Sequence, residues 1–427
     1  MRVLIVGASG FIGMAVASRL AAEGHSVVGV GRSDLRAFPV MEWVRLNVAH
    51  ASDPSMWLPL LQGVNAVVNC AGTLQDSRSD STHGVHDAGV TALFNACEQA
   101  GVRKVIHFSA VGVDRAVTPF SASKLRGDES LMSRDLDWVI FRPSVVIGHN
   151  AYGGSALIRG LAGLSVLPLM PNAGQLQPVY LDDVVESVLF FLNPDAPARM
   201  VLELVGPQRR DFNEWVRVFR RWMRWRPAKS FTLPAWLATA GYRAGDAIAM
   251  LGWKPPVRST AQTEIRYGAV GDAGAWSKVT GIVPRDIERV LAREPASVQE
   301  RWFARLYVLK PLLFGVFALF WIATGLISLG PGWDIGISYV LEGGVSYPLA
   351  AAATIAGALA DIMIGLAIMY RPTTRYGLYA ALLISIAYAI IGSILVPRLW
   401  IDPLGPMLKI WPIIVLNLTA LAILDDR

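Results

Sequence analysis

The sequence predicts two regions of different fold class. The first is an α/β domain with a doubly wound parallel sheet and helices on both faces, and the second is an all-α bundle of four transmembrane helices. Short strand-like apolar runs alternate with helical segments up to about residue 300. From residue 305 the chain becomes a series of long apolar runs with few charges, which indicates a change of solvent. We therefore expect one domain at residues 1–300 and a membrane domain at residues 305–427.

Charge and cysteine content narrow the range of partners. The formal net charge is +6, and the residues after Leu306 carry six Lys/Arg against six Asp/Glu, so the basic excess lies in the first domain. A basic surface beside a membrane favours anionic lipid head groups. No nucleic-acid partner is expected, because the sequence has no Lys/Arg block or known binding motif. Cys70 and Cys97 predict free thiols in a reducing compartment, and no Cys or His spacing typical of a metal site occurs.

A glycine turn near the start of the chain predicts a nucleotide site. Residues 2–6 form a short apolar run typical of a buried strand, GASGFIG follows at residues 7–13, and a helical pattern then ends near Gly24. In this context the glycines let the backbone approach a pyrophosphate, and the helix supplies free N–H groups. The predicted phosphate-binding residues are Gly7, Ser9, Gly10, Phe11, Ile12 and Gly13.

The residues after the second predicted strand, at 25–31, bear on the choice of nicotinamide cofactor. An acidic residue at this position usually binds the ribose of NAD, whereas an arginine pairs with the 2′-phosphate of NADP. The sequence has Arg32 followed by Ser33 here, so both residues are assigned to the cofactor site and NADP(H) is favoured. Asp34 lies close by and keeps NAD(H) open.

Five further motifs, taken with the glycine turn, resemble the atypical or extended branch of the short-chain dehydrogenase/reductase superfamily. They are NCAG at 69–72, KVIHFS at 104–109, FSASK at 120–124, RPSVVIG at 142–148 and QPVYLDDVVESV at 177–188. The resemblance covers about residues 1–300 and is nearest to members related to the NAD(P)-binding accessory subunit of respiratory complex I. It implies a Rossmann fold that binds NAD(P), with Cys70, Ala71 and Gly72 beside the adenine and Pro143 beside the nicotinamide.

One residue departs from the family pattern. Reductases of this family use a tyrosine four residues before the lysine as general acid/base, and this sequence has Phe120 there, which has no proton to give. The resemblance still implies that Lys124 binds the nicotinamide ribose and that Ser109 polarises the substrate, so these two are the catalytic candidates. Tyr152 and Tyr180 are alternative proton donors. Cofactor binding is therefore implied more securely than turnover.

Four apolar segments, at residues 308–329, 349–370, 376–396 and 407–424, are each near the ~20 residues that span a bilayer. Lys and Arg before the first segment, and Arg371 and Arg375 after the second, predict a multi-pass protein of the inner membrane with its first domain in the cytoplasm. WIATGLISL, GALADIMIGL and PRLWIDPLGPMLKIWP resemble the DoxX-like integral membrane family over residues 305–427. This resemblance implies small four-helix proteins often linked to redox or stress functions.

Asp361 and the segment at residues 213–226 each allow two structural interpretations. Asp361, in the middle of the second apolar segment, is either a contact for protons or a quinone head group, or a carboxyl group hydrogen-bonded to a neighbouring helix, which we favour. Residues 213–226 form a basic amphipathic helix that either lies on the membrane surface or packs its tryptophan face inward, and the second is slightly favoured.

Three functions follow, in order of preference. The first is a membrane-anchored NAD(P)(H)-binding oxidoreductase that transfers hydride to a lipophilic or membrane-derived carbonyl compound. The second is a cofactor-bound structural or sensing subunit of a membrane protein complex, which Phe120 favours. The third is an NAD-dependent sugar-nucleotide epimerase or dehydratase, which Phe120 disfavours because those enzymes also use the tyrosine.

Overall fold

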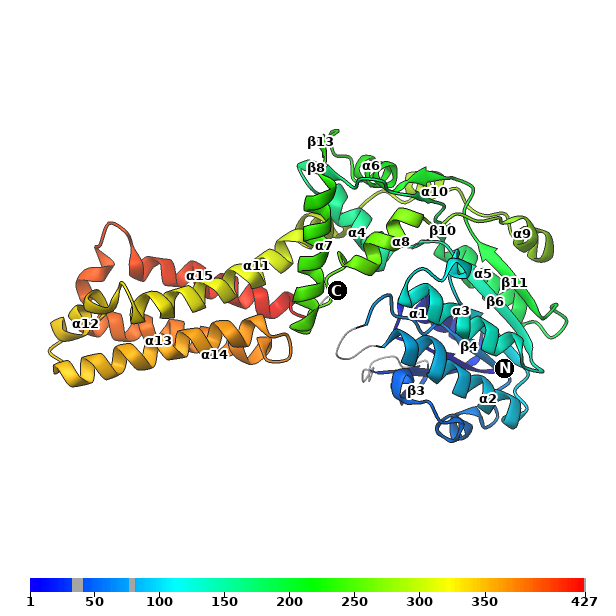
Figure 1. Ribbon diagram of the computed structural model, residues 1–427, viewed down its shortest axis with the longest axis horizontal. Helices are drawn as coiled ribbons and strands as arrows, with labels where there is room; N and C mark the ends of the chain where they lie inside the picture. Colours follow the sequence, from blue (N-terminus) through cyan, green and yellow to red (C-terminus); the bar gives the residue numbers. More distant parts are fainter. Residues whose placement is uncertain (33–40, 77–80, 426–427) are drawn as a thin grey trace. The chain divides into compact units, whose positions relative to one another are not determined.

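A computed structural model describes residues 1–32, 41–76 and 81–425, and the chain divides into two compact units (Figure 1). The α/β unit comprises Met1–Ala247 and Pro255–Ala304. The helical unit comprises Arg305–Arg427 together with the short segment Ile248–Lys254. Ser33 and Asp34, to which the sequence assigned cofactor roles, lie outside the described residues.

The centre of the α/β unit is a parallel sheet of seven strands in the order β11-β6-β5-β4-β1-β2-β3. The strands are β1 (Arg2–Val6), β2 (Ser26–Gly31), β3 (Glu42–Arg45), β4 (Ala66–Asn69), β5 (Lys104–Phe108), β6 (Asp137–Pro143) and β11 (Met200–Leu204). Val3, Leu4 and Ile5 are fully buried, which explains the unbroken apolar run of β1. The strand order reverses between β1 and β4, so ligands are expected at the carboxyl ends of these two strands.

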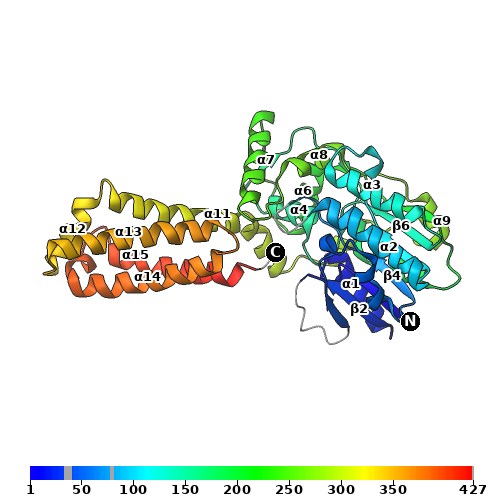
Figure 2. The same ribbon diagram turned by 60° about the horizontal axis from the view of Figure 1, so that its bottom comes forward.

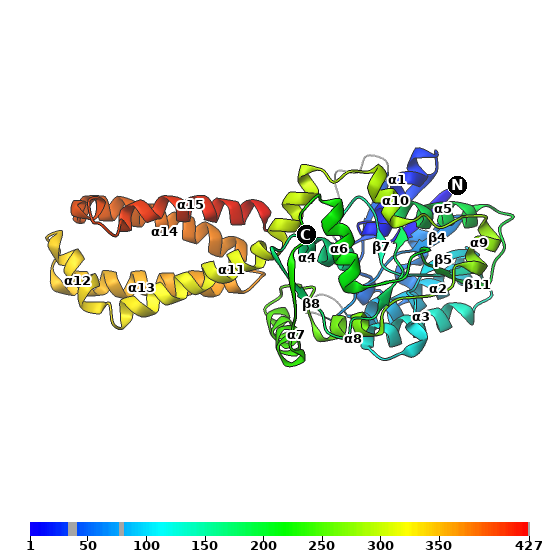
Figure 3. The ribbon, with the colours of Figure 1, turned by 90° about the horizontal axis from the view of Figure 1, so that it is seen from above.

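Helices cover both faces of this sheet, as the sequence predicted (Figure 3). On one face, α1 (Phe11–Ala22) and α5 (Leu181–Leu192) bury Val16, Leu20 and Val188 against the strands. On the other face, α2 (Gly89–Ala100) and α3 (Pro119–Met132) bury Phe94 and Leu131. One turn of π-helix, η4 (Gly84–Ala88), precedes α2, and such turns are frequent at functional sites.

A smaller lobe of the same unit is built from short parallel and antiparallel strand pairs and five of the described helices. The strand pairs are β7 (Val146–Ile147) with β10 (Val179–Tyr180), β8 (Val166–Leu169) with β13 (Lys229–Thr232), and β9 (Gln175–Leu176) with β12 (Arg210–Asp211). The helices are α4 (Gly153–Ala162), α6 (Phe212–Trp222), α7 (Ala235–Met250), α8 (Ser259–Tyr267) and α10 (Ile287–Arg293). Helix α9 (Gly274–Thr280) instead lies beside β11 and buries Trp276 in the core of the large sheet (Figure 1).

Helix α6 is the basic amphipathic segment of the sequence. Asp211 caps its first turn and exchanges hydrogen bonds with Glu214 in a capping box. Trp215 and Phe219 are fully buried, and the Trp215 indole donates to the Leu176 carbonyl at 3.2 Å. The tryptophan face of this helix therefore packs inward, which is the second of the two interpretations.

The helical unit contains α11 (Val298–Leu329), α12 (Trp333–Glu342), α13 (Tyr347–Met369), α14 (Thr374–Leu395) and α15 (Pro406–Ile423) (Figure 2). Four of them, all except α12, are long and apolar enough to cross a membrane. These are the four segments that the sequence predicted, although α11 begins at Val298 rather than near Val308. Outward-facing residues such as Leu383 and Ile394, 68% and 72% exposed, would be costly to hydrate and suit a lipid environment.

Glycines bring α11 and α13 into backbone contact. A Cβ added to Gly365 on α13 would lie 2.6 Å from Ile322 Cγ1 and 2.7 Å from the Ala318 carbonyl oxygen on α11. A Cβ added to Gly325 on α11 would overlap the Ala358 carbonyl oxygen on α13. Small residues allow this approach, and helix association in lipid depends on such close packing.

Asp361 also lies at a helix contact. Its carboxyl group is 2% exposed and accepts a hydrogen bond of 3.0 Å from the Tyr388 hydroxyl on α14. A Cβ added to Gly357, one turn earlier, would lie 3.1 Å from the same hydroxyl, whereas Ala353 is exposed. The hydrogen bond to a neighbouring helix is therefore present. Gly357, Asp361 and Gly365 lie on the side of α13 that contacts neighbouring helices, whereas Ala353, one turn before Gly357, is exposed.

We predict that Gly365→Leu destabilises the helical unit by about 2 kcal/mol, because the added side chain has no space against α11. Thermal unfolding of the full chain in detergent measures the effect. Gly315→Leu is the control, since a Cβ added at Gly315 meets no atom within 4 Å. Equal melting temperatures for the two variants would contradict the close α11–α13 contact.

Candidate cofactor-binding and active site

The glycine turn lies at the reversal of strand order, directly after β1. Gly7 has φ of +77°, and a Cβ added there would lie 2.8 Å from the backbone nitrogen of Ala71 at the end of β4. A Cβ added to Gly13 would overlap the Gly7 carbonyl oxygen. The turn is therefore packed backbone to backbone against both α1 and the NCAG segment, and the structure brings residues 7–13 and 70–72 together.

The amino terminus of α1 fits the pyrophosphate of a dinucleotide. Gly10 caps this helix without a side-chain hydrogen bond, and its first turn contains no acidic residue. The first-turn N–H groups of Phe11, Ile12 and Gly13 have no acceptor within the helix, and the helix dipole favours a negative charge there. The Ser9 hydroxyl lies beside the end of β2, 3.1 Å from where a Cβ on Gly31 would be. The exposed Arg32 follows Gly31 directly.

Lys124 lies on α3 with its ammonium group turned toward the same sheet edge. The residue is 4% exposed, and Nζ donates to the Phe108 carbonyl at 2.6 Å and to the Ala71 carbonyl at 3.4 Å. Burial lowers the pKa of Lys124 to about 8, although the nearby Asp128 and Cys70 oppose this. An ammonium has three N–H groups, so one remains for a ligand.

Phe120 occupies the tyrosine position one turn before Lys124 and packs edge to face on His86, with ring centroids 5.5 Å apart. His86 Nε2 accepts from the Thr73 N–H at 2.9 Å, and Nδ1 lies 3.0 Å from the Ser123 hydroxyl. Burial, with help from Lys124, holds the pKa of His86 well below its usual range, so the ring is neutral at pH 7. Both ring nitrogens are engaged, and His86 does not replace the missing tyrosine as a proton donor.

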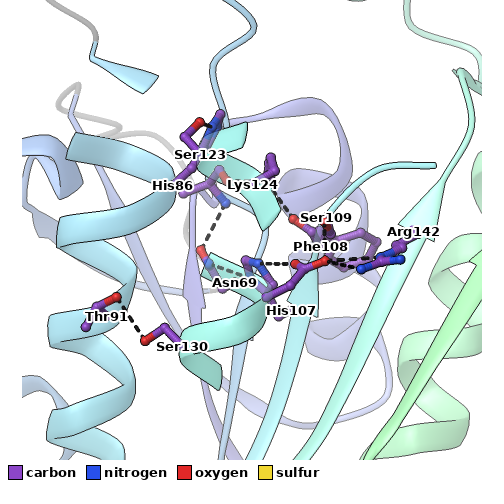
Figure 4. A network of polar contacts seen from close by, with 12 residues as sticks. Asn69, His86, Thr91, His107, Phe108, Ser109, Ser123, Lys124, Ser130 and Arg142 are labelled. Carbon is purple, nitrogen blue, oxygen red and sulfur yellow. Dashed lines mark hydrogen bonds and ion pairs between the residues drawn. The ribbon is translucent and has the colours of Figure 1, made fainter. Parts of the chain in front are cut away.

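Ser109 points into a buried polar network rather than toward a substrate (Figure 4). Its hydroxyl donates to Asp128 Oδ2 at 2.9 Å, and Asp128 is fully buried. The hydroxyl proton that would polarise a carbonyl is therefore committed to a carboxylate. The structure brings Ser109 and Lys124 to the end of β5 but turns the serine inward.

Asp128 lies at the centre of this network and contacts its positive and polar groups. Arg142 donates to Asp128 Oδ2 through Nε at 3.1 Å and Nη2 at 2.9 Å, and His107 Nε2 lies 3.4 Å from Oδ1. Burial alone would raise the pKa of Asp128, but His107, Arg142 and Ser109 outweigh it and lower the pKa, so the carboxylate stays ionised. Asn69 Nδ2 lies 2.9 Å from His107 Nδ1 and extends the network to β4.

None of the sequence motifs predicts this network, although two features of the sequence indicate it. Asp128 follows Lys124 by four residues, which is one helical turn and hence the same face of α3. Arg142 and His107 stand in otherwise apolar strands, and a charged or polar group in a buried strand requires a partner. What the sequence does not contain is the identity of that partner.

The remaining candidates lie at different points of the same unit. The Tyr152 ring stacks on Phe11 of the glycine turn, with centroids 5.9 Å apart and planes 10° from parallel. The Tyr180 hydroxyl donates to Glu294 at 3.1 Å, so its proton is engaged. Pro143 ends β6, and its carbonyl accepts from the Val111 N–H at 3.1 Å. Within the described residues, no group of three His, Cys, Asp or Glu could hold a metal ion.

Comparison with known families agrees with this geometry. Residues 7–160 match the NAD(P)H-binding family, and residues 318–418 match the DoxX-like family. The sheet, the glycine turn and these matches define an NAD(P)-binding Rossmann domain. More particularly, this domain is similar to the atypical short-chain dehydrogenases/reductases and epimerases, and the region after it is similar to the DoxX-like family and has four candidate membrane helices.

Three curated relatives are about a quarter identical to this chain over the aligned residues. A ceramide reductase of Caulobacter vibrioides is 24% identical over 219 residues, which is 51% of this chain and 68% of that protein. The photosystem II assembly factor Ycf39 of Synechocystis is 26% identical over 216 residues, 48% of this chain and 63% of that protein. A UDP-glucose 4-epimerase of Mycolicibacterium smegmatis is 29% identical over 237 residues, 46% of this chain and 74% of that protein.

Solved structures share the fold. MoeE5 in complex with UDP-glucose and NAD aligns with a TM-score of 0.54 and 19% identity, over 72% of this chain and 100% of that chain. The Bordetella bronchiseptica enzyme WbmG in complex with NAD aligns with a TM-score of 0.52 and 15% identity, over 68% of this chain and 92% of that chain. At these identities the likeness concerns the fold alone.

We predict that Asp128→Asn lowers the free energy of unfolding by about 3 kcal/mol, because the buried Nε and Nη2 of Arg142 lose their carboxylate and only the exposed Asp114 remains as a charge partner. Asp114→Asn is the matched control: Asp114 also binds Arg142, at 2.8 Å, but its side chain is 63% exposed, so the loss should be below ~1 kcal/mol. Denaturant unfolding of the full chain compares the two variants.

The effect of Asp128→Asn should depend on pH. A carboxylate with a lowered native pKa stabilises the fold above its unfolded pKa, and this contribution is lost as the pH falls through the native value. The difference between Asp128→Asn and the unchanged chain should therefore shrink below about pH 4. A difference that is independent of pH would mean that Asp128 acts through packing rather than charge.

Proposed function

We propose that this chain is a membrane-anchored oxidoreductase that transfers hydride between a nicotinamide cofactor and a lipophilic carbonyl compound. The proposal rests on one arrangement: the glycine turn and Lys124 lie together at the carboxyl ends of β1, β4 and β5. The same chain contains four candidate membrane helices. The similarity to a ceramide reductase supports a lipid-like substrate. Arg371 and Arg375, which flank the turn between α13 and α14, support a cytoplasmic side for the α/β unit at the inner membrane.

The residues present fit a bound NAD(P)(H), whose nicotinamide would supply or accept the hydride. Residues 7–13 would hold the pyrophosphate, and residues 70–72 would line the adenine side. Arg32, which directly follows Gly31 at the end of β2, would pair with a 2′-phosphate, which favours NADP(H). Pro143 and Lys124 would contact the nicotinamide side.

Lys124 would replace the tyrosine as the proton donor. Phe120 has no proton, and the Ser109 hydroxyl is engaged with Asp128. Lys124 Nζ has an N–H to spare and a pKa of about 8, near the pH at which it would work, which is the condition for efficient acid/base transfer. During reduction Nζ would give a proton to the carbonyl oxygen, and during oxidation it would take that proton back. Asp128, ionised one turn further along α3, raises the proton affinity of Lys124.

A second candidate function is a cofactor-bound subunit that assembles with a membrane complex and does not turn over. The inward orientation of Ser109 together with Phe120 favours it, since neither residue then serves chemistry at the substrate. The similarity to the assembly factor Ycf39 is consistent with it. A sugar-nucleotide epimerase is disfavoured, because the proton transfer of those enzymes depends on the tyrosine that Phe120 replaces.

We predict that the purified full chain binds NADPH more tightly than NADH. Arg32→Ala should weaken NADPH binding about tenfold, because it removes a charged partner of the 2′-phosphate, and should leave NADH binding unchanged. Fluorescence titration of the reduced cofactors measures this, with Arg19→Ala at the far end of α1 as the control. NADH binding that equals NADPH binding and ignores Arg32 would overturn the cofactor preference, and binding of neither would overturn the oxidoreductase proposal.

We also predict that reduction of a long-chain ketone in detergent micelles slows as the pH rises through about 8, because Lys124 loses the proton that it donates. Lys124→Met should lower kcat by about 100-fold or more. Lys124→Arg, which stays charged, should remove the decline near pH 8 even if its rate is low. Tight NADPH binding without reduction of any ketone in a panel would favour the second candidate function, a cofactor-bound subunit of a membrane complex.

A further inference from the structure

A cavity of about 190 Å³ lies in the smaller lobe of the α/β unit, apart from the glycine turn and Lys124. The segment after β8, helix α7 and helix α8 enclose it. Met170, Ala238 and Ile265 form an apolar part of its lining, and Asn172, Thr239 and Gln262 form a polar part. An apolar cavity of about 150 Å³ holds a ligand the size of benzene, whereas whole drug-sized ligands need roughly 300 Å³ or more. The cavity therefore suits one apolar segment of a larger molecule.

Tyr242, which lines this cavity, has a buried hydroxyl without a strong acceptor. Tyr242 is 4% exposed, and within the described residues its hydroxyl donates to Met170 Sδ at 3.0 Å. A thioether is a weak acceptor, so an oxygen atom of a ligand would be a better partner. Burial raises the pKa of Tyr242, which keeps the hydroxyl protonated and able to donate.

A guanidinium group stands at the mouth of the same cavity. Arg266 on α8 lines the cavity and is exposed, and no carboxylate of the described residues pairs with it. Glu264, two residues earlier, is instead hydrogen-bonded to Thr118 at the start of α3. A guanidinium that has no carboxylate partner among the described residues is suited to the phosphate or carboxylate of a ligand in this cavity, because its planar N–H groups match these anions.

Helix α7, which lines the cavity, also exposes apolar side chains, and the chain that follows it belongs to the helical unit. Trp236 and Leu237 on α7 are 72% and 43% exposed. After α7 the chain enters residues 251–254, where the Leu251 carbonyl accepts from the Arg371 N–H at 2.9 Å and the Trp253 indole donates to the Met369 carbonyl at 2.7 Å. Both bonds lead to the turn between the candidate membrane helices α13 and α14. This continuity points to the bilayer as the source of a ligand.

We propose that the cavity binds an anionic membrane lipid, with part of an acyl chain against Met170, Ala238 and Ile265 and the phosphate on Arg266. The Tyr242 hydroxyl donates to an oxygen of the lipid at the junction between these two parts. The Thr118–Glu264 hydrogen bond joins α8 to α3, which carries Phe120 and Lys124, so the lipid lies one helix away from the nicotinamide side. The proposal does not depend on turnover.

The test uses the full chain in phosphatidylcholine nanodiscs, titrated by calorimetry with dihexanoyl phosphatidic acid below its micelle concentration. Dihexanoylglycerol and inorganic phosphate are titrated separately, because they carry only the apolar or only the anionic part. We expect saturable binding of the phosphatidic acid and at least about tenfold weaker binding of the other two. Inorganic phosphate that binds as tightly as the lipid would overturn the lipid assignment in favour of a simple anion site.

Three variants locate the binding. Arg266→Gln should weaken phosphatidic acid binding about tenfold, and Tyr242→Phe, which keeps the packing, should weaken it by about threefold. Arg243→Gln is the matched control, since Arg243 is exposed on α7 next to Tyr242 but does not line the cavity. Equal loss in Arg266→Gln and Arg243→Gln, or no loss in either, would overturn the proposal. NADPH titration of the same samples separates this result from a failure of the cofactor site.

Discussion

The buried carboxylate of Asp128 is the interaction on which the candidate active site depends. It joins α3 to β5 and β6 through Ser109, His107 and Arg142. A buried ion pair contributes little net stability, but removing one partner is costly, because the other charge is then left unpaired in a medium that solvates it poorly. The network therefore fixes the position of α3, and with it the position of Lys124, more firmly than apolar packing alone would.

The same carboxylate decides what the neighbouring side chains can do. By accepting the Ser109 proton, it removes from the site the hydroxyl that the family resemblance assigned to the substrate. By raising the proton affinity of Lys124, it opposes the burial that would otherwise discharge the ammonium. In the proposed reaction, this one buried charge thus leaves the lysine, rather than the serine or the absent tyrosine, as the acid/base group.

The architecture was predictable from the sequence where a local pattern and the fold require the same residues. The strand at residues 2–6 is apolar because β1 is buried on both faces, and Gly7 and Gly13 are required by backbone contacts at the turn. The four apolar segments were predictable because a bilayer demands length and apolarity together. The edge strands β3 and β11 were not singled out, since β3 is only partly buried and β11 buries only Leu202 and Leu204.

The site was predictable only in part, because contacts between distant residues leave no local pattern. The glycine turn and Lys124 carry motif signals, but the pairing of Arg142 with Asp128 arises only when β6 packs beside α3. Likewise, nothing near Trp253 in the sequence shows that its indole binds the Met369 carbonyl. Residues 248–254 interrupt the α/β unit in the chain, and their place with the membrane helices follows from tertiary contacts alone.

The presence of Phe120 has a wider consequence for the class of substrate. A hydride acceptor whose reduced form is a strongly basic alkoxide needs a proton donor at the moment of transfer, whereas a conjugated acceptor spreads the charge and can wait for a proton. The Lys124 ammonium has a pKa of about 8, and two of its N–H groups are bound to carbonyls. It is therefore a weaker proton donor to the substrate than a tyrosine assisted by a lysine. Under the proposed hydride transfer, we therefore expect faster reduction of carbonyl compounds whose reduced form carries a delocalised charge than of simple aliphatic ketones.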